Sequence, residues 1–309
     1  MKFSITIPAY KQKYLNEAIE SCLAQTYKDF ELIIVDDASP EDLKSVVERF
    51  QDSRIRYYRN EKNCGALKVV DNWNISLGYA TGDYVICMGD DDRLLPNCLE
   101  EYSRLIEKYP DLDIYHGMTE IIDEKSRVTN MQEARPEREG IYSMIIGRLR
   151  NCRMQYIGDW LFKRSALQQI NGYVKMPMAW GSDDLTAYIV AKDKGVANTQ
   201  TPVFQYRISS LTITNSGHHR EKAKVQFNVF AKVESLLKEG EGKVGGVEDV
   251  FRMAMLKKMP ELNRVTIDNY MRADMISKGR LSGFVWWFRN IHQFSLSKKE
   301  VVKVFIKSF

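Results

Sequence analysis

Short apolar runs alternate with amphipathic stretches through the first third of the chain, and this rhythm constrains the fold more than any other feature. The apolar runs have the lengths and residue types of strands, and they cover residues 2–8, 30–37, 54–60, 83–89 and 113–118. The stretches between them carry apolar residues at helical spacing. Because strands that alternate with helices form a mostly parallel sheet covered on both faces, the sequence predicts an α/β fold.

Unusual polar residues follow three of these predicted strands. The first strand ends in PAY, the second in DDAS and the fourth in GDDD. The carboxyl ends of parallel strands meet at one edge of a sheet, and ligands bind there. Neighbouring carboxylates about 5 Å apart repel by about 3 kcal/mol at an effective dielectric constant of about 20. We therefore expect a divalent cation to offset the repulsion in GDDD.

Composition excludes several classes of protein. The 309 residues suffice for one large domain or for a domain with an appendage, and a net charge of +4 makes no case for nucleic acid as a partner. The five cysteines are scattered without CxxC spacing, which is typical of reduced thiols in a cytoplasmic protein rather than of disulfides or zinc. No apolar stretch approaches the ~18 residues that a transmembrane helix needs, and the N-terminal run is too short for a signal peptide.

The rest of the chain has a less regular pattern of apolar residues. Residues 122–150 are charged and predict loops, whereas residues 178–195 predict a loop that leads into a helix. A strand is predicted at 196–208, and the sequence after Ser209 is helical in character to its end. Ser297 and Glu300 form a capping-box pattern at the start of the last predicted helix.

Four motifs occur in a fixed order: PAY at residues 8–10, VDD at 35–37, GDDD at 89–92 and WGSDD at 180–184. Together they closely resemble the family 2 glycosyltransferases. Over residues 1–210, the resemblance implies a GT-A (Rossmann-like) fold, with a mixed, mostly parallel sheet flanked by helices. Residues 211–309 are expected to form a helical C-terminal extension on the acceptor side, in contact with an oligomer partner or a membrane surface.

The resemblance assigns the nucleotide to one group of residues. In the family the matching segments hold the base or lie beneath the nucleotide, and the matching positions here are Pro8, Ala9, Tyr10, Asp37, Asn63 and Gly65. The resemblance places Asp90 facing the ribose, or assisting the metal through water. A tyrosine ring can stack on a base, and a carboxylate can accept a hydrogen bond from a base N–H. The alternative is purely structural, with the tyrosine ending a strand and the acids and amide forming turns.

GDDD occupies the position of the family's metal motif. The resemblance makes Asp91 the metal-binding acid and Asp92 the acid that follows it, with Mn²⁺ or Mg²⁺ as the cation. The chain departs from the commonest form because Gly89 stands where the first aspartate often is. Diphosphate oxygens and water would then supply more of the ligands. The alternative is an acidic cluster that caps the next helix.

WGSDD matches the family's second acidic motif, which supplies the catalytic base. The helical register places Asp184 on the base and Asp183 on its partner, although either could serve, and both could also act as N-caps. Arg207 matches a position that contacts the diphosphate. Trp180 is expected to line the acceptor cleft or to lie in the core.

The resemblance implies an inverting transferase that moves a sugar from a nucleoside diphosphate donor, UDP-linked, to a hydroxyl of a saccharide or lipid-linked saccharide in surface polysaccharide synthesis. Such enzymes work in the cytoplasm, at the inner face of the membrane. The alternative is a catalytically silent nucleotide-sugar-binding protein that assists a partner enzyme. The aromatic and basic stretch at 279–294 suggests either a membrane-surface helix or a buried one, and its nearly all-round apolar pattern favours burial.

Overall fold

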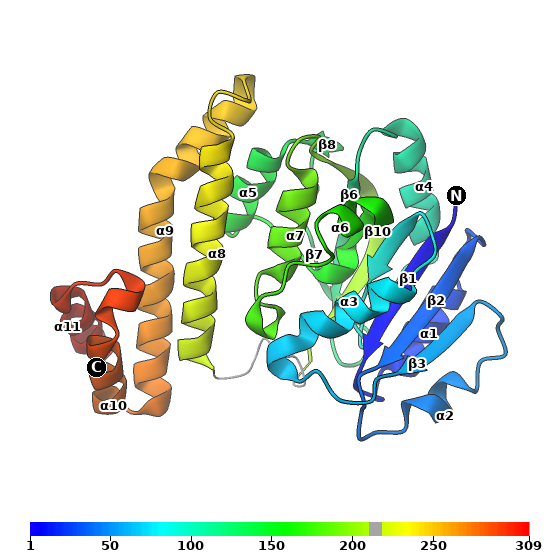
Figure 1. Ribbon diagram of the computed structural model, residues 1–309, viewed down its shortest axis with the longest axis horizontal. Coiled ribbons are helices and arrows are strands. Elements are labelled where there is room, and N and C mark those ends of the chain that lie inside the picture. Colours follow the sequence, from blue (N-terminus) through cyan, green and yellow to red (C-terminus); the bar gives the residue numbers. More distant parts are fainter. Residues whose placement is uncertain (210–217, 309) are drawn as a thin grey trace. The chain divides into compact units, whose positions relative to one another are not determined.

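The structure is a computed structural model that describes residues 1–209 and 218–308 (Figure 1). The chain divides into two compact units, Met1–Thr212 and Ile213–Phe309. The domain boundary that the sequence suggests, between residues 210 and 211, lies outside the described residues and stays a prediction.

One mixed sheet forms the centre of the first unit, in the order β3-β2-β1-β4-β9-β6-β10-β5, with β7 beside β6 and β8 beside β10. Its strands are β1 (Phe3–Ala9), β2 (Phe30–Asp36), β3 (Ile55–Arg59), β4 (Tyr84–Cys87), β5 (Arg93–Leu94), β6 (Ile114–Ile122), β7 (Val128–Met131), β8 (Arg138–Glu139), β9 (Trp160–Lys163) and β10 (Val196–Arg207). Pairing is parallel from β3 through β2 and β1 to β4, and again between β6 and β10. The antiparallel β9 joins the two parallel parts, so the predicted α/β class is confirmed.

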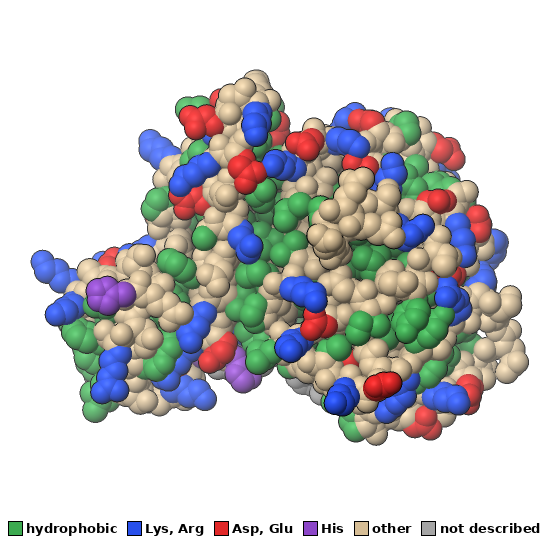
Figure 2. Space-filling model, in the orientation of Figure 1, with side chains coloured by type: hydrophobic (Ala, Val, Ile, Leu, Met, Phe, Trp, Pro, Cys, Tyr) green, Lys and Arg blue, Asp and Glu red, His purple; other side chains and the backbone are tan. Residues whose placement is uncertain are grey.

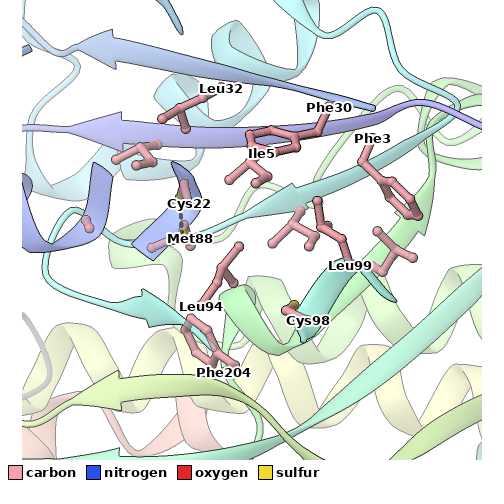
Figure 3. Packing of buried hydrophobic residues seen from close by; sticks show 14 of the residues in the cluster. Phe3, Ile5, Cys22, Phe30, Leu32, Met88, Leu94, Cys98, Leu99 and Phe204 are labelled. Atoms are coloured by element: carbon pink, nitrogen blue, oxygen red, sulfur yellow. Dashed lines mark hydrogen bonds between the residues drawn. The ribbon is translucent and has the colours of Figure 1, made fainter. Parts of the chain in front are cut away.

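Helices cover this sheet. They are α1 (Leu15–Leu23), α2 (Leu43–Val47), α3 (Val69–Tyr79), α4 (Cys98–Lys108), α5 (Ile141–Leu149), α6 (Arg164–Gln169) and α7 (Ser182–Ala191), with the short helices η1 (Ala66–Lys68), η2 (Ile157–Asp159) and η3 (Pro177–Ala179). Alternate residues of a strand face opposite sides of the sheet. Ile5 and Leu32 therefore share one face, where they pack in one buried cluster with Cys22 of α1 and Leu99 of α4 (Figure 3).

The loop-rich interpretation of residues 122–150 is wrong in part. This segment contains the strands β7 and β8 and the nine-residue helix α5. Ile141, Met144 and Ile145 are buried side chains of α5, and their spacing of three and four residues is helical. The charged residues upstream hid this short apolar pattern.

The second unit is helical, as expected. It contains α8 (His219–Glu239), α9 (Gly246–Lys278), α10 (Arg280–Arg289), η5 (Ile291–Phe294) and α11 (Lys298–Lys307). The predicted capping box of Ser297 and Glu300 begins α11. Trp287 is fully buried beside Met271 and Phe294, and Phe284, Trp286 and Phe288 are partly buried against the same cluster. The aromatic stretch is therefore buried in part, since Leu281 is 70% exposed. Within the described residues, no helix is both long and apolar enough to cross a membrane.

Candidate active site

The ends of β1 and β4 are joined by Asp90. Its Oδ2 accepts hydrogen bonds from the backbone N–H groups of Tyr10, at 2.6 Å, and Lys11, at 2.7 Å. Asp90 is buried, and this burial together with the charge of Asp91 raises its pKa to about 6. In this structure Asp90 fixes the turn that presents Tyr10, and its predicted contact with the nucleotide stays a prediction.

Asp37, at the end of β2, holds the loop that follows β3. Its carboxylate accepts hydrogen bonds from Asn60 Nδ2 at 2.8 Å, from Asn63 Nδ2 at 3.1 Å and from the backbone N–H of Cys64 at 3.0 Å. The backbone N–H of Asp37 donates to the carbonyl of Ala9 at 2.9 Å. The predicted residues of the first, second and third strand ends therefore lie within one connected network.

The other predicted nucleotide residues belong to the same edge of the sheet. Pro8 and Ala9 are the last two residues of β1. Tyr10 follows them with 44% of its surface exposed, so its ring is accessible for stacking. Gly65 precedes η1 with φ of +81°, a left-handed conformation that favours glycine.

Gly89 explains how the acidic motif is arranged. A Cβ atom at this position would lie 2.9 Å from Asp91 Oδ1 and 2.8 Å from Asp92 Oδ2. Both carboxylate oxygens therefore face the space that a side chain at position 89 would fill. Two convergent carboxylate oxygens are ligands that suit Mn²⁺ or Mg²⁺, so these residues fit a divalent cation.

Electrostatics also favours a cation at this point. Burial raises the pKa of Asp91, and burial with the charge of Asp91 raises the pKa of Asp92 well above its usual range. A bound cation would lower these pKa values again, because it favours the charged form of both carboxylates. Across residues 1–209 and 218–308, no group of three or more His, Cys, Asp and Glu side chains could hold a metal. Diphosphate and water would therefore have to complete the shell.

Arg207, the last residue of β10, lies beneath the acidic motif. Its backbone N–H donates to Asp92 Oδ1 at 2.9 Å, and its Nε donates to the carbonyl of Asp91 at 2.7 Å. The guanidinium also donates to Glu17 Oε2, Ser126 Oγ and the carbonyl of Asp123. Arg207 is fully buried and these bonds hold the acidic motif in place, while its predicted contact with the diphosphate stays a prediction.

The second acidic motif opens α7. Both carboxylate oxygens of Asp184 accept from Nε of Arg148, at 3.1 and 3.0 Å. Asp183 is partly exposed and accepts from the backbone N–H of Asp184 at 2.9 Å. Partial burial and the charge of Asp184 raise the pKa of Asp183 to about 7. Arg148 orients the predicted base, and sequence reasoning missed it because it lies on the overlooked helix α5.

The backbone before Asp183 is strained. Met178 and Ala179 have φ of 59° and 54°, in the left-handed region that residues other than glycine rarely adopt. Such strain is concentrated at functional sites. Trp180 follows at the end of η3 and is partly buried, so its role on the acceptor side stays a prediction.

Two observations link this motif to the nucleotide side. The helix η3 contacts η1, the turn that follows Gly65. Tyr156 stacks on Tyr206 with ring centroids 3.7 Å apart. Burial is the main cause of its raised pKa, and the charges of Arg148 and Asp92 act on it in opposite directions. Tyr206 directly precedes Arg207, whose backbone N–H donates to Asp92, so the stacked tyrosine pair lies next to the first acidic motif.

A further buried acid, Asp159, should make the free energy of unfolding of this protein depend on pH. Burial raises its pKa to about 7, so the folded chain binds a proton there that the unfolded chain has released above pH 3.8. Stability linked to Asp159 therefore falls as the pH rises from about 4 to about 7. We expect the free energy of unfolding of native protein to lose about 2 kcal/mol more than that of Asp159→Asn between pH 5 and 7.

Urea unfolding of both proteins at the two pH values measures this difference. Asn keeps the shape of the protonated acid and can still accept from Gln132, which donates to Asp159 Oδ2 at 2.9 Å. Equal pH slopes for native protein and variant would show that Asp159 is ionised throughout the range.

The fold and the acids at its strand ends define an α/β protein of the GT-A class. The model of the family described as "Glycosyl transferase family 2" matches residues 4–170, which is more than half of the chain. This chain belongs to that family.

Curated relatives share part of its length. An uncharacterized glycosyltransferase of Rickettsia typhi is 33% identical over 126 residues, which are 40% of this chain and 38% of that protein. The GalNAc(5)-diNAcBac-PP-undecaprenol beta-1,3-glucosyltransferase of Campylobacter jejuni is 38% identical over 110 residues, 35% of this chain and 34% of that protein. The alignments thus span less than half the length of these relatives.

Solved structures show the same fold at low identity. Residues 1–349 of S. aureus TarS, in complex with UDP-GlcNAc, align with a TM-score of 0.65 and 14% identity over 100% of this chain and 90% of that one. The mannosyltransferase PcManGT of Pyrobaculum calidifontis, in complex with GDP-Man and Mn²⁺, aligns with a TM-score of 0.51 and 16% identity over 99% and 86%.

Proposed function

We propose that this chain moves a sugar from a nucleoside diphosphate donor, UDP-linked, to a hydroxyl of a saccharide or lipid-linked saccharide, with inversion at the anomeric carbon. The observation that carries the proposal is the pair of carboxylate oxygens, from Asp91 and Asp92, that converge beside Gly89 at the edge where the strand ends meet. The setting that we propose is cytoplasmic, at the inner face of a membrane, in the synthesis of a surface polysaccharide.

Each residue group has one task in this proposal. Asp37 and Asn63 receive the base, and the exposed ring of Tyr10 stacks on it. Asp91 and Asp92 hold a divalent cation, which when bound neutralises charge on the leaving diphosphate. Asp184 takes the proton from the acceptor hydroxyl as that oxygen attacks the anomeric carbon in line. Asp183 stands beside it as the alternative base.

The comparisons support the donor and the acceptor class. The Campylobacter relative is named for transfer to an undecaprenol-linked saccharide, and the TarS structure was solved with UDP-GlcNAc. The presence of Mn²⁺ in the PcManGT complex supports a divalent cation. Inversion comes from the family resemblance, because nothing in the geometry of these residues alone selects it.

A thermal-shift screen of nucleotide sugars with and without Mn²⁺ tests the proposal. A ligand at about 100 times its Kd stabilises a protein by about 2.7 kcal/mol, so a cognate UDP-sugar should raise Tm by about 5 °C only when Mn²⁺ is present. Stabilisation confined to ligands without a nucleotide would contradict the proposal. Binding of a UDP-sugar without hydrolysis or transfer to any acceptor would instead identify the catalytically silent binding protein.

A further inference from the structure

The last helix of the second unit, α11, carries apolar side chains on two opposite sides. Val301 and Val304 are buried in the core of the unit, beside Trp287. Val302 and Ile306 are not part of that core, and 39% and 64% of their surfaces are exposed. Burial within the unit therefore accounts for one side of α11 and leaves the other side unexplained.

The exposed side of α11 consists of two parallel rows. Residues four positions apart lie above one another on a helix. Lys298, Val302 and Ile306 therefore form one row, and Lys299, Lys303 and Lys307 form the row beside it. These six residues line a shallow groove of about 490 Å³. The first row is apolar apart from Lys298 at its start, and it lies directly beside a row of three lysines.

The charge of this side is strongly positive. All four lysines of α11 are exposed, and the helix contains one acid, Glu300. Glu300 is already engaged, since it forms an ion pair with Arg264 Nε at 2.9 Å and accepts hydrogen bonds from Ser297. Figure 2 shows hydrophobic and basic side chains together over the region where Figure 1 draws α10 and α11.

We propose that the exposed face of α11 binds the surface of an anionic lipid bilayer. A helix lying flat in the interface buries its apolar row among the acyl chains and directs its basic row to the lipid phosphates. A nucleic acid would use the lysines but would leave Val302 and Ile306 without a partner. A second copy of the chain would bring like charges together across the contact, which disfavours self-association.

Sedimentation of the full-length chain with lipid vesicles tests this proposal. We expect native protein to sediment with vesicles that contain phosphatidylglycerol and to stay in solution with vesicles of phosphatidylcholine alone. The double variant Lys303→Glu/Ile306→Glu should bind the anionic vesicles at least ~10-fold more weakly, because it removes apolar area and reverses a charge. Added salt should weaken binding of the native protein.

The matched control is Lys257→Glu/Val247→Glu, which makes the same changes in charge on α9 and replaces a valine instead of an isoleucine. Val247 is 63% exposed, close to the value for Ile306, and Lys257 is exposed as well. This control should bind like native protein. The proposal is wrong if both double variants bind the anionic vesicles equally, or if native protein binds neither kind of vesicle. It is also wrong if light scattering shows a dimer that the α11 variant dissociates. Membrane binding by α11 does not depend on the proposed sugar transfer. Nucleotide binding, measured in the same samples, shows whether the donor site is intact independently of the vesicle result.

Discussion

Asp184→Asn is expected to lower kcat by about 10²–10⁴-fold, the usual contribution of a positioned general base. The amide keeps the size of the side chain and can still accept from Arg148, but it cannot take a proton from the acceptor hydroxyl. The KM for the nucleotide sugar should change little, because the proposed role of Asp184 is on the acceptor side. Steady-state rates with a competent acceptor measure the effect.

Asp183→Asn separates the two carboxylates of this motif. If Asp184 is the base, Asp183→Asn should retain most of the native kcat. The opposite pattern would make Asp183 the base, which its pKa near neutrality also permits. Near-native turnover in both variants would show that neither residue takes the proton. UDP-induced thermal stabilisation should persist in each variant and thus shows that it is folded.

Asp91→Asn is expected to reduce kcat/KM for the nucleotide sugar by about 10³-fold at a fixed Mn²⁺ concentration. A neutral amide oxygen is a weaker ligand than a carboxylate, so the cation and the diphosphate would be held less firmly. Raising the Mn²⁺ concentration should recover part of the activity. Rates measured across a Mn²⁺ titration give both the loss and the recovery.

Two further variants separate loss of a ligand from general damage. Asp111→Asn removes a surface carboxylate that pairs with Arg138, and it should leave the Mn²⁺ dependence unchanged. Gly89→Ala retains both acids but places a methyl group within 3 Å of their oxygens, so it should also weaken Mn²⁺ binding. Native metal-dependent transfer by Asp91→Asn would defeat the metal assignment.

The strands and strand ends that form the site could be predicted, because they depend on local sequence patterns. Apolar runs that end close to Tyr10, Asp37 and Asp90 predict buried strands that lead into polar residues, and parallel pairing then brings those ends to one edge. The order of the motifs supplied the family. These signals lie within short segments, so one sequence is enough to read them.

The roles of individual polar side chains could not be read in the same way. The sequence does not reveal that Arg207 bonds to Glu17 and Asp123, which are 190 and 84 residues away in the chain. Arg148 pairs with Asp184 across 36 residues and lies on a helix that charged neighbours concealed. Such pairings arise only from tertiary packing, and no spacing rule reports them.

A crystal structure of this chain with UDP and Mn²⁺ tests directly whether the ends of β1, β2 and β4 form a nucleotide and metal site. We expect the uracil to lie between Tyr10 and the loop held by Asp37, and the metal ion to be coordinated by Asp91 beside Gly89, with the diphosphate directed towards Asp184. A nucleotide bound away from the carboxyl ends of β1, β2 and β4, or a metal ion that does not contact Asp91, would contradict this expectation.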